Sequence, residues 1–338
     1  MNLLDKKWLL LSFLLLIVGF GGACPDRHPG RTLILAAYTA PREAFREINQ
    51  AFEKNWREKT GETIKIQESY LSSGAQSRAV VDGFAADVVV LALDVDVDRL
   101  GQAGLIQENW RQGPNKGILT ESIVAFAVRP GNPKGIKDWE DLLQKELKVL
   151  TPNPKTSGGA QWNVLAAYGA ALRGKVPGIS QDPKGAVDFL SRLLGQVTAM
   201  DKGARESILT FERGLGDVAL SYENEIYQGQ RHGQNYELIR PQSTILIQNP
   251  VALVDKNIEE HGNRELAEAY LKFLFSPEAQ AIFAQHGFRP VEGTTRKAFE
   301  KKFPPVADLF TIEFFGGWGK AMPKFFGEKG IFIEASEK

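Results

Sequence analysis

The chain has 338 residues, 43% of them hydrophobic and 24% charged, proportions that are ordinary for a soluble globular protein. Its 41 basic residues balance 41 acidic ones, so the sequence gives no sign of a nucleic-acid partner. This length is enough for a full hydrophobic core and predicts two lobes. Any anion that binds must be held by local geometry, because there is no bulk positive charge.

The first 23 residues have the pattern of a signal peptide. Lys6 and Lys7 form a charged start, residues 8–20 are almost continuously apolar, and the small residues 21–23 suit a cleavage site. The apolar run is too short for a helix that spans a membrane. The sequence therefore predicts an exported protein with a signal peptide at 1–23.

The only cysteine, Cys24, directly follows the predicted cleavage site. A single cysteine cannot form an internal disulfide. The segment resembles a bacterial lipoprotein signal, which implies a lipid-modified Cys24, a tether at 24–31 and a periplasmic protein anchored to the membrane. Ordinary cleavage that leaves a free thiol is the alternative.

Alternating strand and helix patterns predict an α/β fold for the rest of the chain. Strands are expected at 33–37, 64–68, 88–93, 148–150 and 218–221. Helices are expected at 41–58, 76–83, after Ser157, and at 187–194, 206–213, 264–275 and 277–285. In the first of these helices apolar residues recur at spacings of three and four, and Gly61 ends it.

Two apolar segments, 123–128 and 245–254, are expected to cross between the lobes. Between them lies a second set of strands and helices. The sequence therefore predicts a discontinuous first lobe, formed by residues 32–121 and 246–338, and an inserted second lobe, formed by residues 122–245.

Four turns share one design, in which small polar residues stand between a strand end and a helix start. They are Tyr38-Thr39-Ala40-Pro41, Leu71-Ser72-Ser73-Gly74-Ala75, Thr156-Ser157-Gly158-Gly159 and Asp201-Lys202-Gly203-Ala204-Arg205. In open α/β sheets, ligands bind beyond the carboxyl ends of strands, where such turns gather. A cleft between two lobes would bring several positive helix ends around one anion.

The turn at Ser157 is the most informative of the four. Serine is a good helix N-cap, and the two glycines after it leave their backbone N–H groups approachable. These N–H groups have no partner inside the helix, so the turn can hold an oxyanion. It is not a nucleotide-type phosphate loop, because Lys155 precedes the glycines and no lysine follows them.

The chain resembles the periplasmic sulfate-binding proteins of ABC transporters, and their thiosulfate-binding relatives, from about residue 32 to residue 332. The matching segments are 128–133, 152–160, 212–218, 267–271, 276–278 and 315–318. The resemblance implies a two-lobed, type II periplasmic-binding-protein fold, in which each lobe is a mainly parallel sheet flanked by helices. It implies a monomeric, non-enzymatic protein that captures sulfate and delivers it to an ABC permease.

The resemblance also implies a set of neutral hydrogen-bond donors for sulfate. These are Thr39, Ser73, Ser157, Gly158, Gly159, Ala204 and Tyr222. Two of them depart from the family pattern, which usually has aspartate in place of Thr39 and tryptophan in place of Tyr222. Tyr222 can be a donor or a structural residue. Arg78 and Arg205 are expected to play supporting or surface roles.

Proton counting separates the candidate anions. Sulfate only accepts hydrogen bonds, whereas monohydrogen phosphate must donate one and needs an acceptor. None of the seven implied donors is a carboxylate, so a phosphate proton would be left unpaired at a cost of ~1–3 kcal/mol. Asp201 and Glu223 would weaken this argument if either pointed inward. Thiosulfate, molybdate and chromate stay open.

A hydrolase that uses the Ser157 turn as an oxyanion hole is the alternative from another class. It needs a general base, but His28 lies in the tether, and His232, His261 and His286 lie in polar stretches that are expected at the surface. No metal site or cofactor is predicted. The acidic segment 94–98 lacks the glycine and terminal glutamate of a calcium loop and is expected to begin a helix.

Overall fold

The structure is a computed structural model that describes residues 31–107 and 109–338. Its strands form one sheet in the order β2-β1-β3-β9-β4-β7-β5-β6, in which β8 and β10 also pair with β4 and β11 also pairs with β9. The predicted signal peptide, the tether, Cys24 and His28 lie outside the described residues. No helix among the described residues is both long enough and apolar enough to cross a membrane.

One end of the sheet is parallel. Its strands are β1 (Thr32–Tyr38), β2 (Lys65–Leu71) and β3 (Val88–Val90), with β1 in the middle. The helices between and around them are α1 (Arg42–Thr60), α2 (Ser73–Val81), α3 (Asp94–Gln102), α8 (Asp255–His261), α9 (Arg264–Leu274), α10 (Pro277–Gln285) and α11 (Gly293–Ala298). Helix α1 buries its predicted apolar face and ends at Gly61, which has a left-handed backbone.

The other end of the sheet repeats this alternation. Its strands are β5 (Val149–Pro152), β6 (Val197–Asp201), β7 (Val218–Tyr222) and β8 (Glu237–Ile239). Its helices are α4 (Gly158–Leu172), α5 (Pro183–Gly195), α6 (Ala204–Glu212) and α7 (Glu223–Arg231). Strand β5 lies between β6 and β7 and is parallel to both. This end is therefore a second α/β unit.

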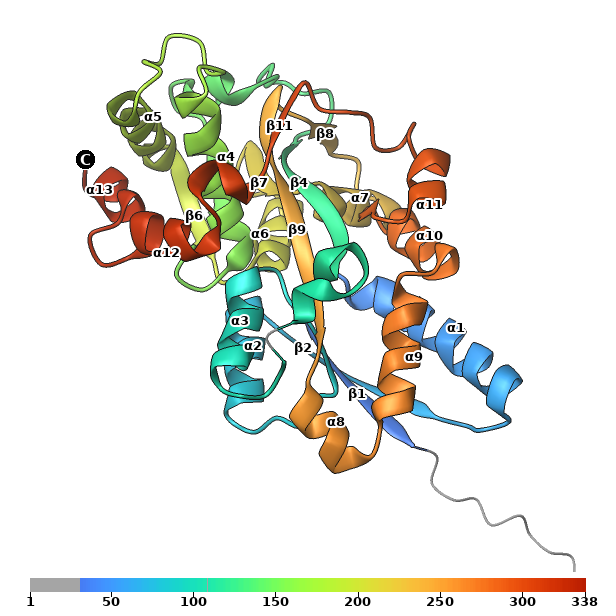
Figure 1. Ribbon diagram of the computed structural model, residues 1–338. Helices are drawn as coiled ribbons and strands as arrows, with labels where there is room; N and C mark the ends of the chain where they lie inside the picture. Colours follow the sequence, from blue (N-terminus) through green and yellow to red (C-terminus); the bar gives the residue numbers. More distant parts are fainter. Residues whose placement is uncertain (1–30, 108) are drawn as a thin grey trace, which may run out of the picture. The chain divides into compact units, whose positions relative to one another are not determined.

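Two long strands join the two ends, as Figure 1 shows. They are β4 (Ile118–Val128) and β9 (Ser243–Leu253), and they pair antiparallel near the middle of the sheet. The C-terminal part of β4 pairs with β7, whereas the C-terminal part of β9 pairs with β3. The crossings that the sequence predicts at 123–128 and 245–254 thus fall on these two strands.

The C-terminal segment contains β10 (Arg289–Pro290), β11 (Asp308–Phe310), α12 (Trp318–Phe326) and α13 (Ile331–Glu337). Strand β10 pairs with β4, but β11 pairs with the start of β9, and α13 packs against α5. The domain boundaries stay a prediction. These contacts favour a revision, which we propose, in which residues 308–338 belong with the second lobe.

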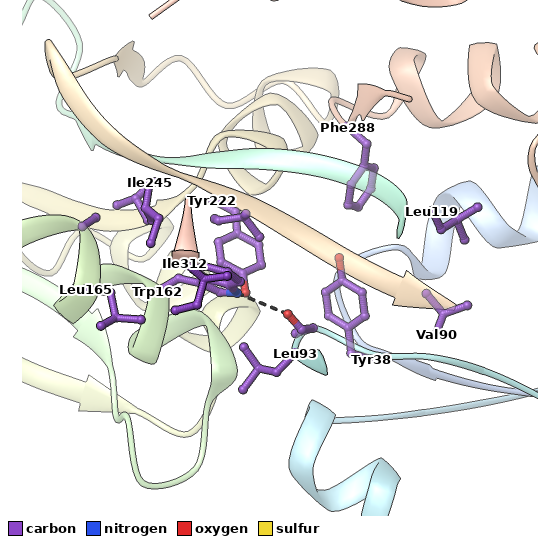
Figure 2. Packing of buried hydrophobic residues seen from close by; sticks show 14 of the residues in the cluster. Tyr38, Val90, Leu93, Leu119, Trp162, Leu165, Tyr222, Ile245, Phe288 and Ile312 are labelled. Atoms are coloured by element: carbon purple, nitrogen blue, oxygen red, sulfur yellow. Dashed lines mark hydrogen bonds between the residues drawn. The ribbon is translucent and has the colours of Figure 1, made fainter. Parts of the chain in front are cut away.

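Helix α4 is buried along most of its length, because it packs against α5 and the strands β9, β7, β5 and β4, and aromatic rings of α12 contact it. The Trp162 ring meets the Trp318 ring edge to face at a centroid distance of 4.6 Å, an arrangement that adds to the stabilisation from buried area. The same core continues past Tyr222 and Tyr38 to Phe288 (Figure 2). This core therefore packs against the residues at the carboxyl ends of β1 and β7.

Candidate anion-binding site

A cavity of about 520 Å³ lies where the carboxyl ends of β1, β2 and β7 meet the starts of helices α2, α4 and α6. All seven residues that the sequence singles out line it. The other lining residues are Tyr38, Ala40, Arg42, Tyr70, Leu71, Ser72, Ala92, Lys202, Gly203, Arg205, Glu206, Leu209 and Glu225. The structure thus brings the four predicted turns together at one place.

The helix starts at this cavity leave backbone donors free. Helices α1, α2 and α6 have no side-chain cap at Pro41, Ser72 and Gly203, respectively. The first N–H groups of a helix have no intrahelical acceptor and lie at its positive dipole end. Three such ends that meet one cavity form an environment suited to an anion, without the need for a cationic side chain.

Ser157 is the N-cap of α4, and its Oγ accepts a long hydrogen bond of 3.4 Å from the Ala160 N–H. Because the oxygen accepts this bond, its own O–H remains available to donate. The serine is 5% exposed and lines the cavity. The Ser157 hydroxyl therefore keeps a proton that it can donate at the cavity, which its predicted role requires.

The two glycines after Ser157 allow close approach. A methyl group at Gly158 would lie 3.1 Å from Leu93 Cγ, on the segment after β3. A methyl group at Gly159 would lie 3.1 Å from Ala204 Cβ. Both distances are tighter than ordinary van der Waals contact. Glycine at both positions therefore lets α4 begin close to Leu93 and to the start of α6 without displacing either.

Ser73 has a structural use for its hydroxyl. Its Oγ donates to Asp96 Oδ2 at 2.5 Å and accepts from the Ala92 N–H at 2.9 Å. Thr39 likewise donates its hydroxyl to the Leu71 carbonyl oxygen at 3.2 Å. In this geometry neither hydroxyl is available to an anion, so any contact from Ser73 or Thr39 would come from the backbone.

Tyr222 is 1% exposed, and its buried hydroxyl has no hydrogen-bond partner among the described residues. The hydroxyl of Tyr38 is buried and unpaired in the same way. Burial, with the nearby Glu225 carboxyl, raises the pKa of both phenols well above the usual value. Both therefore remain neutral donors, and Figure 2 shows the two rings among the buried hydrophobic residues.

Three cationic residues line the cavity, namely Arg42, Lys202 and Arg205. The Arg42 guanidinium lies 4.8 Å from the centre of the Tyr70 ring, and Arg205 Nη1 lies 3.5 Å from Glu225 Oε2. Two of the three thus have partners of their own. Arg78 does not line the cavity.

Glu206 and Glu225 also line the cavity, so the expectation of a site without a carboxyl group is wrong. Glu225 is 1% exposed, and its Oε1 has no partner among the described residues. Burial raises the pKa of Glu225 to about 7, and Arg205 opposes that rise. The two acidic residues that sequence analysis considered, Asp201 and Glu223, are not lining residues.

The position of Glu225 in the sequence indicates that it lies near the site. Glu225 lies three residues after Tyr222, at the third position of α7. The first turn of a helix that begins at a site places such residues near it. Tyr38 ends β1 directly before Thr39, and residues at the carboxyl ends of such strands are expected near the ligand.

None of the histidines in the described residues lines the cavity. His232 contacts Glu43, and His261 contacts Asp87. The sequence predicted His286 at the surface, and this prediction is wrong. His286 is 3% exposed and its Nε2 lies 2.9 Å from Glu47 Oε1. Within the described part of the chain there is no cluster of three or more metal-ligating side chains. The acidic segment 94–98 begins α3, as expected.

Comparison with known proteins identifies the family of the chain. The model of the bacterial extracellular solute-binding proteins matches residues 33–289. The chain belongs to this family. The sulfate-binding protein of Synechococcus elongatus is 44% identical over 306 residues, which cover 90% of this solute-binding protein and 86% of that relative. The thiosulfate-binding protein of Pseudomonas aeruginosa is 37% identical, with coverages of 97% and 98%.

A solved structure agrees with these relatives. The sulfate-binding protein from Mycobacterium tuberculosis superposes with a TM-score of 0.80 at 36% identity, covering 88% of this chain and 99% of that one. The predicted two-lobed, type II periplasmic-binding-protein fold is confirmed. Because the relatives are binding proteins and not enzymes, the prediction of a protein without catalytic turnover is confirmed too.

Proposed function

We propose that this solute-binding protein captures sulfate in the cavity and delivers it to an ABC permease outside the cytoplasm. The observation that carries the proposal is the convergence of the four turns, together with all seven predicted donors, on one cavity. The names of the relatives, sulfate-binding and thiosulfate-binding proteins, support the choice of anion. Their extracellular family supports the location.

The donors supply enough binding free energy. Each hydrogen bond to a charged group contributes roughly 1.5–3 kcal/mol. Micromolar affinity requires ~8 kcal/mol, and ordering and desolvation costs reduce the sum. The backbone N–H groups of Gly158, Gly159 and Ala204, with the Ser157 hydroxyl, are the donors that this proposal depends on most. Tyr222 adds a neutral phenol.

Selection against phosphate depends on Glu225. An ionised carboxylate beside the anion would accept the proton of monohydrogen phosphate and remove the basis for rejecting it. Arg205, which lies 3.5 Å from Glu225 Oε2, occupies one side of this group. We propose that Glu225 pairs with Arg205 and does not serve as a ligand. Sulfate should therefore bind, and phosphate should not.

Isothermal titration of the mature protein tests these statements. Sulfate should bind at one site per chain, whereas phosphate should give no heat of binding at millimolar concentration. Phosphate binding as tight as that of sulfate in the wild type, lost in Glu225→Gln, would show that Glu225 accepts a ligand proton. Absence of sulfate binding would overturn the proposed function itself.

Thiosulfate is the second candidate ligand. Relatives named for it match nearly the whole chain, and tyrosine replaces the expected tryptophan at residue 222, which changes the reach of that donor. The same titration with thiosulfate decides between the two anions. A thiosulfate affinity at least tenfold higher than the sulfate affinity would reassign the ligand.

We further propose that Cys24 carries a lipid that anchors the mature protein, and that the protein is a monomer. The anchor rests on the sequence around Cys24, which lies outside the described residues. Metabolic labelling with a fatty acid tests it, because the label should appear in the wild type and be absent from Cys24→Ser. Light scattering of the mature protein tests the monomer.

A further inference from the structure

Helices α1 and α7 both start at the cavity but belong to different lobes. Arg42, the first residue of α1, lines the cavity, and α7 begins directly after Tyr222. Helix α1 packs with β2, α9 and α10, whereas α7 packs with β4, β7 and β8. A link between these helices therefore joins the two lobes beside the proposed sulfate site.

Such a link exists on the first two turns of α1. Glu43 Oε2 accepts a hydrogen bond from Gln228 Nε2 and lies 3.1 Å from His232 Nε2. Glu47 Oε1 accepts a hydrogen bond of 3.0 Å from Arg231 Nη2. We call these five residues, with the contacts between them, the α1–α7 clasp.

A buried histidine holds the clasp in place from a third helix. His286, which follows α10, lies 2.9 Å from Glu47 Oε1 through Nε2 and 3.3 Å from Gln228 Oε1 through Nδ1. The next residue, Gly287, has a φ of +92°, and a methyl group there would lie 2.7 Å from Tyr227 Cβ. The end of α10 is thus in close contact with α7. His286 therefore restricts the position of Glu47 where Glu47 pairs with Arg231.

We propose that Glu43 and Glu47 are positioning residues that hold the start of α1 against the second lobe and so slow the opening of the cavity. This inference rests on the proposed function. Ion pairs between half-exposed groups, such as Glu47 at 42% and Arg231 at 41%, are individually weak. A lobe opening is, however, an equilibrium between states that differ by a few kcal/mol. Several weak contacts that are present only in the closed state therefore shift this equilibrium measurably.

The principal test is the rate at which bound sulfate dissociates, measured by stopped-flow tryptophan fluorescence. Glu43→Ala/Glu47→Ala should release sulfate about threefold to tenfold faster than the wild type, as expected for the loss of several exposed contacts. The control is Glu58→Ala, which removes one carboxylate from α1, where Glu58 Oε1 lies 3.9 Å from Lys54 Nζ. Its rate should equal that of the wild type.

A double-mutant cycle separates a link between helices from a general effect of charge. Glu47→Ala and Arg231→Ala should each increase the rate, and the double variant should increase it by less than the product of the two effects. Sodium chloride should accelerate release from the wild type more than from Glu43→Ala/Glu47→Ala, because salt screens the ion pair. Fully independent effects in the cycle would overturn the proposal.

Small-angle X-ray scattering without sulfate distinguishes failure of the clasp from failure of the proposed function. The ligand-free Glu43→Ala/Glu47→Ala protein should have a larger radius of gyration than the wild type and Glu58→Ala, whichever anion the site takes. An unchanged radius, or a sulfate release rate equal to that of the wild type, would overturn the clasp. If the wild type does not bind sulfate but the Glu43→Ala/Glu47→Ala variant still has the larger radius, the clasp is supported and the proposed ligand is refuted.

Discussion

The indole nitrogen of Trp162 donates a hydrogen bond of 3.2 Å to the carbonyl oxygen of Ala92, and this bond joins the two lobes at the edge of the cavity (Figure 2). Trp162 lies on α4, one turn after the Ser157 turn, whereas Ala92 follows β3 and lines the cavity. The bond therefore fixes the predicted donors of α4 relative to the first lobe.

Trp162→Phe should weaken sulfate binding. The variant removes the indole donor and leaves the Ala92 carbonyl with one partner fewer, so the closed arrangement loses stability relative to the open one. A hydrogen bond of this kind contributes ~0.5–1.5 kcal/mol, which predicts a roughly 2- to 10-fold loss of affinity. Isothermal titration with sulfate measures the loss.

Trp139 provides a matched control for the loss of a buried indole. Its Nε1 donates to the Ser243 carbonyl oxygen at 2.8 Å, and neither residue lines the cavity. Trp139→Phe should lower the unfolding temperature but leave sulfate affinity unchanged. Equal losses of affinity in the two variants would indicate that the Trp162 bond has no special part in closure.

Ser157→Ala should weaken sulfate binding by roughly 10- to 100-fold, because it removes a hydroxyl donor to a charged ligand. The control is Ser276→Ala, at the N-cap of α10, where the serine Oγ accepts from Ala279 N–H at 3.2 Å. Both variants should lose up to ~1 kcal/mol of stability from the lost cap. Only Ser157→Ala should lose affinity, as compared by titration and thermal unfolding; a normal affinity would exclude its hydroxyl as a ligand.

Gly159→Ala should reduce sulfate affinity by more than tenfold. The new methyl group would lie 3.1 Å from Ala204 Cβ and 3.3 Å from Ser157 Oγ, so the starts of α4 and α6 must move apart. Gly195→Ala is the control, because no atom lies within 4 Å of the added methyl group. It should keep its affinity and gain up to ~1 kcal/mol of stability. Titration of both variants decides, and an unaffected Gly159→Ala would contradict the close approach.

The sequence allowed much of this site to be predicted, because each donor belongs to a local pattern. A serine or glycine between a strand and a helix can be recognised from its neighbours, and parallel strands bring such turns to one edge of a sheet. The crossing segments could be predicted for a similar reason. Their apolar runs lie within the strands themselves.

The remaining features depend on contacts between distant segments. Ser73 bonds to Asp96, 23 residues away, so no local pattern showed that its hydroxyl is used. His286 meets Glu47 across 239 residues, and its polar neighbours suggested a surface position instead. The C-terminal helices α12 and α13 were not predicted as helices, and their residues were assigned to the first lobe. Their place is set by the α4 and α5 surfaces that they cover.

Glu225 should make the free energy of unfolding depend on pH near neutrality. Burial raises its pKa in the folded protein from 4.5 to about 7, so between these values the folded state binds more protons than the unfolded state. Stability should therefore fall as pH rises through this window, by up to ~1.4 kcal/mol per pH unit from this group. Urea unfolding at a series of pH values from 5 to 8, without sulfate, measures the slope.

Glu225→Gln supplies the comparison, because glutamine keeps the shape of the side chain but does not titrate. The wild type should lose stability relative to this variant as pH rises from 5 to 7, and the difference should level off above pH 7. Other carboxyl groups contribute equally to both proteins and cancel in the difference. A difference that stays constant with pH would mean that Arg205 already holds Glu225 ionised in the folded state, and that the carboxylate is present beside the anion throughout.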